Sequence, residues 1–351
     1  MIALPPFGQL LPLLALLAQN DPSGGAAPLL EKGERLFRQG DTAGALAAFE
    51  EAAKADPRDA RPQYLAGVTL EKKGDAAAAT AAYRRAIGLK NDFAEAHNNL
   101  GALLIARGDA AGAAGELEAA VRTKPDYAEA QYNLGVARDA LGKKPEAVAA
   151  YRAAVRLKPS DAGYRLNLGA ALRRTGDVAG AVAALKDATR LAPRDAVAWA
   201  DLGMVLSDQK SYDEAQAALD KATQLKPDFA LGWNRLGRVE LKRGQLPAAV
   251  AAQERARKLD GKNGAFAADL CRALLEQKDA ARAAGECRAA VDLDPQSPLA
   301  HYELMKVLVA KGDCPAARSE LGRFKAMPGV KPEAQKQADA IVATCTKRGA
   351  K

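Results

Sequence analysis

Hydrophobic positions recur along this chain in a helical pattern with a period of 34 residues. Positions 4, 7, 8 and 11 of each repeat share one helix face, because successive residues turn by about 100° around the axis. We assign this face to the core. A fixed period of this length is typical of stacked repeats, in which each repeat packs only on its neighbours. The pattern divides the chain into nine repeats, which start at residues 26, 60, 94, 128, 162, 196, 230, 264 and 298.

Small residues occupy the same places in successive repeats. Position 8 is glycine in seven repeats, position 27 is alanine in eight, and position 20 is alanine in all nine. The alanines at position 20 are Ala45, Ala79, Ala113, Ala147, Ala181, Ala215, Ala249, Ala283 and Ala317. Because side chains of this size let two helix backbones approach closely, each repeat is predicted to hold two tightly packed helices.

A predicted break separates the two helices of each repeat. Position 15 is glycine in seven repeats, as at Gly74 and Gly108, and aspartate often follows, as at Asp75 and Asp109. Glycine supplies the left-handed residue that ends a helix, and aspartate caps the N-terminus of the next one. Three repeats add a proline at position 18, in the first turn of the second helix, where its missing N–H costs nothing. Each repeat is therefore predicted to be a helical hairpin.

These columns resemble the tetratricopeptide repeat, whose pattern is Leu-Gly at positions 7 and 8, alanine at 20, an aromatic residue at 24, alanine at 27 and proline at 32. The repeat that starts at residue 128 matches this pattern with Leu134, Gly135, Ala147, Tyr151, Ala154 and Pro159. The resemblance implies an all-α fold, a right-handed superhelical solenoid of helical hairpins over residues 28–330. Residues 331–351 are expected to form a capping helix and a basic tail, with an apolar side made by Ala334, Ala338, Ile341, Val342 and Cys345.

Residues 1–27 differ from the rest of the chain. Residues 1–18 carry no charged side chain, and the apolar run 10–18 has the length of the apolar segment of a signal peptide. We expect a signal peptide over 1–18, a flexible linker over 19–27, and a periplasmic or secreted mature protein. The alternative is a cytoplasmic protein with a short apolar tail or a misassigned start codon.

The sequence offers no chemistry that indicates an enzyme. It contains no phosphate-binding, dinucleotide-binding or metalloprotease motif, and its carboxylates are spread without pairing over helix surfaces and loops. Its two histidines, His97 and His301, both fall at position 4, in repeats too far apart in a solenoid to share a metal. We expect no catalytic residues, no metal and no cofactor.

Charge and composition limit the class of partner. The formal charge is +8, which favours acidic partners, but both signs are interspersed and no long basic run alternates with aromatic residues. We therefore expect a protein or peptide partner, acidic or extended, and no nucleic acid. Some relatives grip a C-terminal carboxylate of a chaperone with a lysine at position 5; no repeat has lysine there, so that function is not expected.

The face opposite the core holds positions 2, 6, 9 and 13, and the resemblance implies that it lines a concave groove. Three consecutive repeats have asparagine at position 6, namely Asn99, Asn133 and Asn167. Side-chain amides can donate to and accept from a peptide backbone, and the resemblance to sugar-transferring relatives implies a backbone-holding asparagine ladder. Asn98 and Tyr132, at position 5, are included in this site. The alternative is that asparagine is common here and faces water. Because these asparagines lie opposite the core, alanine there should leave the melting temperature nearly unchanged.

Basic residues gather towards the C-terminal side of the predicted groove. Five of them fall at positions 6, 9, 12 or 13, namely Arg173, Arg174, Arg235, Arg238 and Lys242. We interpret them as a mildly basic half-groove that contacts the partner. Solvated charge is the alternative, because Asp201 and Asp208 interrupt the stripe.

All four cysteines lie in the last 81 residues. Cys271 and Cys287 are nearly equidistant from the turn between their helices, and Cys314 begins a helix that should run antiparallel to the one holding Cys345. Of the three possible pairings, the geometry favours Cys271–Cys287 and Cys314–Cys345, in an oxidising compartment. Buried free thiols in a cytoplasmic protein are the alternative.

Two functions from different classes remain open. The first is a non-catalytic scaffold that holds an extended segment of a partner in the concave groove, in the bacterial cell envelope. The second is a structural assembly component that acts through its convex face or by self-association.

Overall fold

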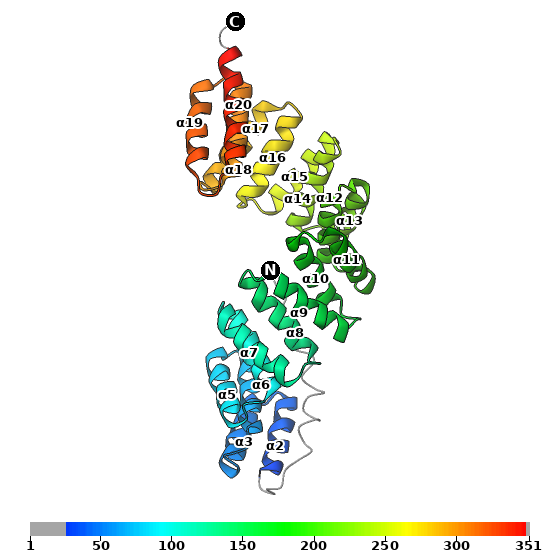
Figure 1. Cartoon of the computed structure of the whole chain (residues 1–351), viewed down its shortest axis with the longest axis vertical. Coiled ribbons are helices and arrows are strands. Elements are labelled where there is room, and N and C mark those ends of the chain that lie inside the picture. Colours follow the sequence, from blue (N-terminus) through cyan, green and yellow to red (C-terminus); the bar gives the residue numbers. More distant parts are fainter. Residues whose placement is uncertain (1–25, 349–351) are drawn as a thin grey trace. The chain divides into compact units, whose positions relative to one another are not determined.

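The computed structural model describes residues 26–348, which form helices and short connections (Figure 1). Nineteen helices and no strand occur in this range. The signal peptide expected over 1–18 and most of the linker expected over 19–27 lie outside the described residues. The first helix begins at Ala27, so this residue belongs to the array rather than to the linker. No helix among the described residues is long and apolar enough to cross a bilayer.

The chain divides into two compact halves, and each is described by itself. The N-terminal half ends at Thr175. Its helices are α2 (Ala27–Gln39), α3 (Thr42–Ala55), α4 (Arg61–Lys73), α5 (Ala76–Leu89), α6 (Ala94–Ala106), α7 (Ala110–Thr123), α8 (Ala128–Ala140), α9 (Lys144–Leu157) and α10 (Ala162–Thr175). Helices α2 to α9 pair into four hairpins that match the first four predicted repeats.

The C-terminal half begins at Gly176. Its helices are α11 (Val178–Leu191), α12 (Ala196–Asp208), α13 (Tyr212–Leu225), α14 (Ala230–Lys242), α15 (Leu246–Leu259), α16 (Gly264–Glu276), α17 (Ala280–Leu293), α18 (Pro298–Lys311), α19 (Cys314–Ala326) and α20 (Pro332–Arg348). Helices α12 to α19 pair into four further hairpins, and the first helices of successive hairpins, such as α14, α16 and α18, also touch one another.

The break predicted inside each repeat is present in all nine. Position 15 has a positive φ in every repeat: seven are glycines, and the other two are Lys210 (φ 66°) and Lys278 (φ 68°). Aspartate at the next position caps the following helix, as where the Ala78 N–H donates to Asp75 Oδ1 at 3.0 Å. The turn therefore keeps its left-handed residue even where the sequence lacks glycine.

The two helices of a hairpin approach most closely between positions 8 and 24. A Cβ atom added to Gly135 would lie 2.7 Å from a ring carbon of Tyr151, so only glycine fits there without a shift. All nine alanines at position 20 are fully buried. The small residues that repeat in the sequence thus allow close contact between the two helices of a hairpin.

The same two positions hold Cys271 and Cys287 in the hairpin of α16 and α17, where a disulfide joins them with a Cα–Cα distance of 5.3 Å. A second disulfide joins Cys314, at the start of α19, to Cys345 on α20, with a Cα–Cα distance of 5.6 Å. These are the two pairings that the sequence favoured. Helix α20 lies where the capping helix was predicted, and it buries Ala338 and Val342 in the core of the last hairpin.

Position 4, which we assigned to the core, has a more polar role. In six repeats its side chain makes a hydrogen bond with the backbone carbonyl six residues earlier, at position 32 of the preceding repeat. Trp199 donates to Pro193 O at 3.0 Å, and Trp233 donates to Pro227 O at the same distance. Glutamine, histidine, tryptophan and arginine all supply an N–H here, which explains why this column lacks a fixed apolar residue.

Candidate partner-binding surface

The three asparagines at position 6 lie in the seam between the first helices of successive repeats. Each donates from Nδ2 to the side chain at position 5 of the preceding repeat: Asn99 to Tyr64 Oη at 3.4 Å, Asn133 to Asn98 Oδ1 at 3.0 Å, and Asn167 to Tyr132 Oη at 3.2 Å. The predicted residues Asn98 and Tyr132 therefore lie beside these asparagines as their acceptors. Burial, with the charge of Asp161, raises the pKa of Tyr132 to about 12, so its hydroxyl stays protonated.

The expectation that all three asparagines lie away from the packed interior is wrong for Asn133, which is 4% exposed. Asn99 and Asn167 are half-buried. The physical reason is that the first helices of neighbouring repeats pack side by side, so the Asn133 side chain on α8 contacts the first helix of the preceding repeat, α6. Alanine at these positions should therefore lower stability, contrary to the expectation from the sequence. Contact of these side chains with a partner stays a prediction.

Four of the five predicted basic residues make contacts of their own or are half-buried. Arg174 pairs with Asp139, and Arg235 pairs with Asp201. Lys242 donates to Ser207 Oγ at 2.9 Å and lies over the Tyr212 ring, and Arg173 is half-buried. Arg173 and Arg174 belong to the N-terminal half and the other three to the C-terminal half, so the five are not described as one surface.

Arg238 on α14 differs from these residues. Its side chain is exposed and has no ion-pair or hydrogen-bond partner within residues 26–348. The local sequence explains this. Arg272 and Lys306 occupy the same position 9 of the next two repeats, and each pairs with an acid at position 6 of its own repeat. The repeat of Arg238 has Arg235 at position 6, so Arg238 lacks that acid.

Arg238 lies at the wall of a hollow between α14 and α16, with a volume of about 790 Å³. Its polar lining includes Asn234 and Asp269, and its apolar lining includes Leu231, Phe266 and Leu299. This volume is within the range of natural small-ligand sites, roughly 300 to 1,000 Å³. Of this lining, Arg238 alone was predicted from the sequence.

A buried polar network forms the floor of this hollow and continues towards α18. Asn234 Nδ2 donates to Gln253 Oε1 at 2.8 Å and to Asp269 Oδ2 at 2.9 Å. Arg272, which lies 3.8 Å from Asp269, donates from Nε to Glu303 Oε1 at 2.7 Å. The network thus links three repeats through their first helices.

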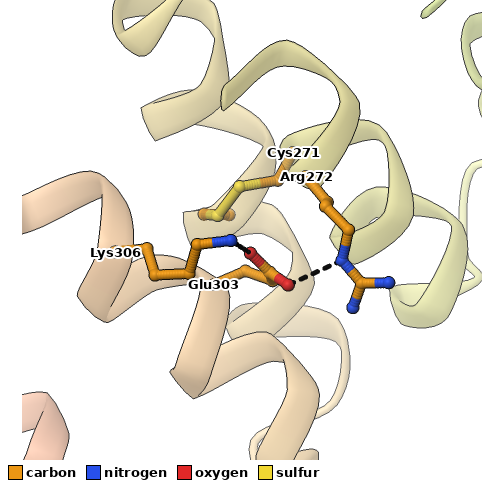
Figure 2. The surroundings of a disulfide bond; sticks show 5 residues. Cys271, Arg272, Glu303 and Lys306 are labelled. Atoms are coloured by element: carbon orange, nitrogen blue, oxygen red, sulfur yellow. Dashed lines mark hydrogen bonds and ion pairs between the residues drawn. A yellow bond between two sulfur atoms is a disulfide. The ribbon is translucent and has the colours of Figure 1, made fainter. Parts of the chain in front are cut away.

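Glu303 is the most buried charge of this network, at 1% exposed, and it lies between two cations (Figure 2). Lys306 Nζ donates to Glu303 Oε2 at 3.0 Å, on the opposite side from Arg272. Burial alone would lower the pKa of Arg272, but the charge of Glu303 and its hydrogen bond outweigh burial and raise it. A buried carboxylate with two cationic donors is satisfied internally, so Glu303 is a structural residue rather than a contact for a ligand.

One column of the sequence distinguishes the surface beside the hollow. Position 2 is apolar in four successive repeats of the C-terminal half, and Val197 (42%) and Leu231 (39%) stay exposed. In the N-terminal half the same position holds two glutamates that pair with lysines. This contrast between halves was the available sequence signal.

The arrangement can bind but shows no catalytic constellation. Within the described part of the chain, no group of three or more His, Cys, Asp or Glu side chains is placed to hold a metal ion. His97 and His301 each contact one glutamate and one backbone carbonyl in their own surroundings. The surface offers apolar contact, an unpaired guanidinium and amides, which are groups that recognise peptides.

A family model described as "Tetratricopeptide repeat" matches residues 30–92, 98–162, 132–196, 166–229, 200–264 and 234–298. No match was found among curated proteins.

Solved structures with similar folds are also helical-repeat proteins. The Cut9–Hcn1 hetero-tetramer structure of the APC/C matches with a TM-score of 0.57 and 18% identity over 85% of this chain and 59% of that chain. PilF of Pseudomonas aeruginosa matches with a TM-score of 0.51 and 18% identity over 58% of this chain and 93% of its own. A tetratricopeptide repeat protein of Parabacteroides merdae matches with a TM-score of 0.51 and 15% identity over 72% of this chain and 99% of its own. These likenesses bear on the fold alone.

Proposed function

The chain belongs to the tetratricopeptide repeat family, and from this premise we propose that it is a non-catalytic scaffold that holds an extended segment of a partner protein. The segment lies along the first helices of the repeats in the C-terminal half. Repeats of this family present protein-interaction surfaces, and a solenoid of them offers a long surface on which a partner can lie.

The observation that carries this proposal is the row of apolar residues at position 2 beside an open hollow. Val197 and Leu231 are large, apolar and exposed, and Leu299 continues the row on α18. Large exposed apolar side chains that lie in a row on one face are typical of binding surfaces. The second helices carry ion pairs, such as Arg257 with Glu286 and Arg282 with Glu254, together with the exposed Leu293 on α17.

We further propose that the protein works in the bacterial cell envelope. Two features support this location. Residues 10–18 are an apolar run of signal-peptide length, and all four cysteines lie in pairs that form disulfides. Disulfides persist in oxidising compartments and are rare in the cytosol.

Site-specific photo-crosslinking in the native cells tests the binding surface. A photo-reactive residue replaces Leu231, on the first helix of one hairpin, or Arg255, on the exposed side of its second helix α15. We expect position 231 to crosslink one partner at a defined peptide and position 255 to give no such product. Mass spectrometry of the crosslinked peptides reads out both.

The reverse result would replace this proposal with the other function. If position 255 crosslinks a partner or a second copy of this chain while position 231 does not, the protein is an assembly component that acts through the second helices. The location is tested separately. Mature protein that begins near Gln19 in the envelope fraction supports it, and intact Met1 on cytosolic protein contradicts it.

A further inference from the structure

We propose that the hollow between α14 and α16 binds a partner segment in which an apolar side chain lies next to an acidic side chain. The apolar side chain contacts Leu231, Phe266 and Leu299, and the carboxylate pairs with Arg238. This inference rests on the proposed function and names the class of segment that the surface takes.

The apolar part of the site is open to a ligand. Leu231 is exposed at the rim, Leu299 is half-buried, and Phe266 lies buried in the wall. A side chain of the size of leucine or phenylalanine removes this apolar surface from water when it binds, which favours binding.

The charged part of the site has one cation that is not neutralised. Asp269 is held by Asn234 and Arg272. Asp260, at the edge of the hollow, accepts from the Lys262 N–H at 3.2 Å and from Asn263 at 3.5 Å. Arg238 has no such partner among the described residues. A guanidinium binds a carboxylate through two parallel hydrogen bonds, so the site favours an acid over a neutral side chain.

The acid belongs to an internal segment rather than to a chain end. The apolar row at position 2 includes Leu231 and Leu299 inside the hollow and continues beyond it to Val197 on α12. A partner chain therefore finds apolar contact outside the hollow as well as within it, and its backbone does not have to end there.

Peptides blocked at both ends test this inference with the full chain. Three ten-residue probes have Gly-Ser flanks and a centre of Leu-Glu, Leu-Gln or Ala-Glu, and a fluorescent label reports binding by anisotropy. We expect Leu-Glu to bind at least about fivefold more tightly than Leu-Gln or Ala-Glu, a difference of about 1 kcal/mol for each group. The preference for Glu over Gln should shrink as salt is raised, because Arg238 is exposed to solvent.

Two variants show which residue of the protein causes each preference. Arg238→Gln should remove the preference for Glu over Gln and keep the preference for Leu over Ala. Leu231→Ser should remove the preference for Leu over Ala and keep the preference for Glu over Gln. Arg255→Gln is the matched control, since Arg255 lies in the same hairpin, is exposed and loses the same charge; both preferences should survive it.

Three results would overturn the inference. The first is no binding of the Leu-Glu peptide at about 1 mM, and the second is a preference for Glu that survives Arg238→Gln. The third is tighter, Arg238-dependent binding of a peptide that ends in a free Leu carboxylate, which would identify a chain end as the ligand. Crosslinking of a partner at position 231 together with any of these results leaves the scaffold function standing and rejects only the class of segment. Crosslinking at position 255 alone rejects the scaffold function.

Discussion

The Nδ2 atom of Asn133 lies 3.0 Å from the Oδ1 atom of Asn98, 35 residues earlier in the chain, and both side chains are buried. The donor is at position 6 of one repeat and the acceptor at position 5 of the repeat before it. A column of asparagines that the sequence presents as a possible ligand ladder therefore holds successive repeats together. Its hydrogen bonds are already made in the free protein.

Replacement of Asn133 by alanine should destabilise the N-terminal half by about 1 to 2 kcal/mol, because it removes the donor to the buried Oδ1 of Asn98. The Nδ2 of Asn98 keeps its hydrogen bonds with Asn99 and Tyr127. Replacement of both asparagines should cost less than the sum of the single changes, since each change breaks the same bond. Chemical denaturation of the four proteins in this cycle measures the coupling. Glu50→Ala, on the exposed face of α3, is the control. A free energy of unfolding for Asn133→Ala equal to that of the parent would contradict this assignment.

Lys210 and Lys278 have left-handed backbone conformations without being glycine, so their replacement by glycine should stabilise the protein. A side chain with a Cβ atom costs roughly 1 to 2 kcal/mol in this conformation, and glycine offsets part of that gain through a more flexible unfolded chain. We expect Lys210→Gly and Lys278→Gly to stabilise by about 0.5 to 1 kcal/mol each. Gly244→Lys, at the same position of the repeat between them, should destabilise by a similar amount. Thermal unfolding of the three variants checks the signs.

The two disulfides should differ in how easily they are reduced. Cys271 and Cys287 are fully buried, whereas Cys314 is only half-buried at the start of α19. A thiol reagent in solution therefore reaches the Cys314–Cys345 pair first. Graded reduction followed by alkylation and peptide mapping should label Cys314 and Cys345 before the other pair. Labelling in the opposite order would show that α20 shields its disulfide more than this packing implies.

Loss of either disulfide should lower stability. The pairs close loops with sequence separations of 16 and 31 residues, which corresponds to about 3 to 4 kcal/mol each in the chain-entropy model. Cys314→Ser with Cys345→Ser should expose α20 to hydrogen exchange while the hairpins before α18 keep their protection. Exchange rates of α20 that match those of the oxidised parent would show that apolar packing alone holds the cap.

His97 should make stability depend on pH. Its Nδ1 lies 2.6 Å from Glu116 Oε2 and its Nε2 lies 2.9 Å from Asn91 O, so both nitrogens face acceptors. The hydrogen bond with Glu116 raises the pKa of His97, against the effects of burial and of the Arg122 charge. Because the folded pKa is raised, this stabilisation is complete below the unfolded value of about 6.5 and is lost as pH rises through the folded value.

The variant His97→Gln isolates the titrating group. Gln131 occupies position 4 of the next repeat and donates to Pro125 O, so glutamine is expected to keep the carbonyl bond. The parent should be more stable than His97→Gln at about pH 5.5, and the difference should shrink above about pH 8. When the parent and His97→Gln both also carry Glu116→Gln, the difference in stability between them should depend little on pH. A difference that grows with pH would mean that the imidazole is held neutral.

Much of this fold could be predicted from the sequence, because the repeats share the same contacts. A glycine at position 8 faces a larger residue at position 24 in the hairpin of Gly135 and Tyr151, and the same spacing located the Cys271–Cys287 pair. Both follow from contacts within one hairpin, which recur identically. The break at position 15 was also predicted, although Lys210 and Lys278 lack the glycine that signals it.

Contacts between repeats were harder to predict. A helical wheel places position 6 opposite the core of its own hairpin, but it contains no information on the neighbouring first helix that covers Asn133 and Glu303. The hollow beside Arg238 depends on differences between repeats, namely apolar residues at position 2 and an arginine at position 6 where the next repeats have an acid. Such differences are visible in the columns, but their effect depends on packing in three dimensions.

The central claim is that a partner segment lies along the first helices of the C-terminal half. The most direct measurement is the affinity of the crosslinked segment, made as a synthetic peptide, for the parent and for Leu231→Asp. This change places a charged side chain in the apolar row. Because the Leu231 side chain is exposed, the backbone of α14 should stay unchanged. We predict binding at least about tenfold weaker, a loss of about 1.4 kcal/mol, with Arg255→Asp on α15 unchanged. Binding to Leu231→Asp within about threefold of the parent, or an equal loss with Arg255→Asp, would contradict the claim.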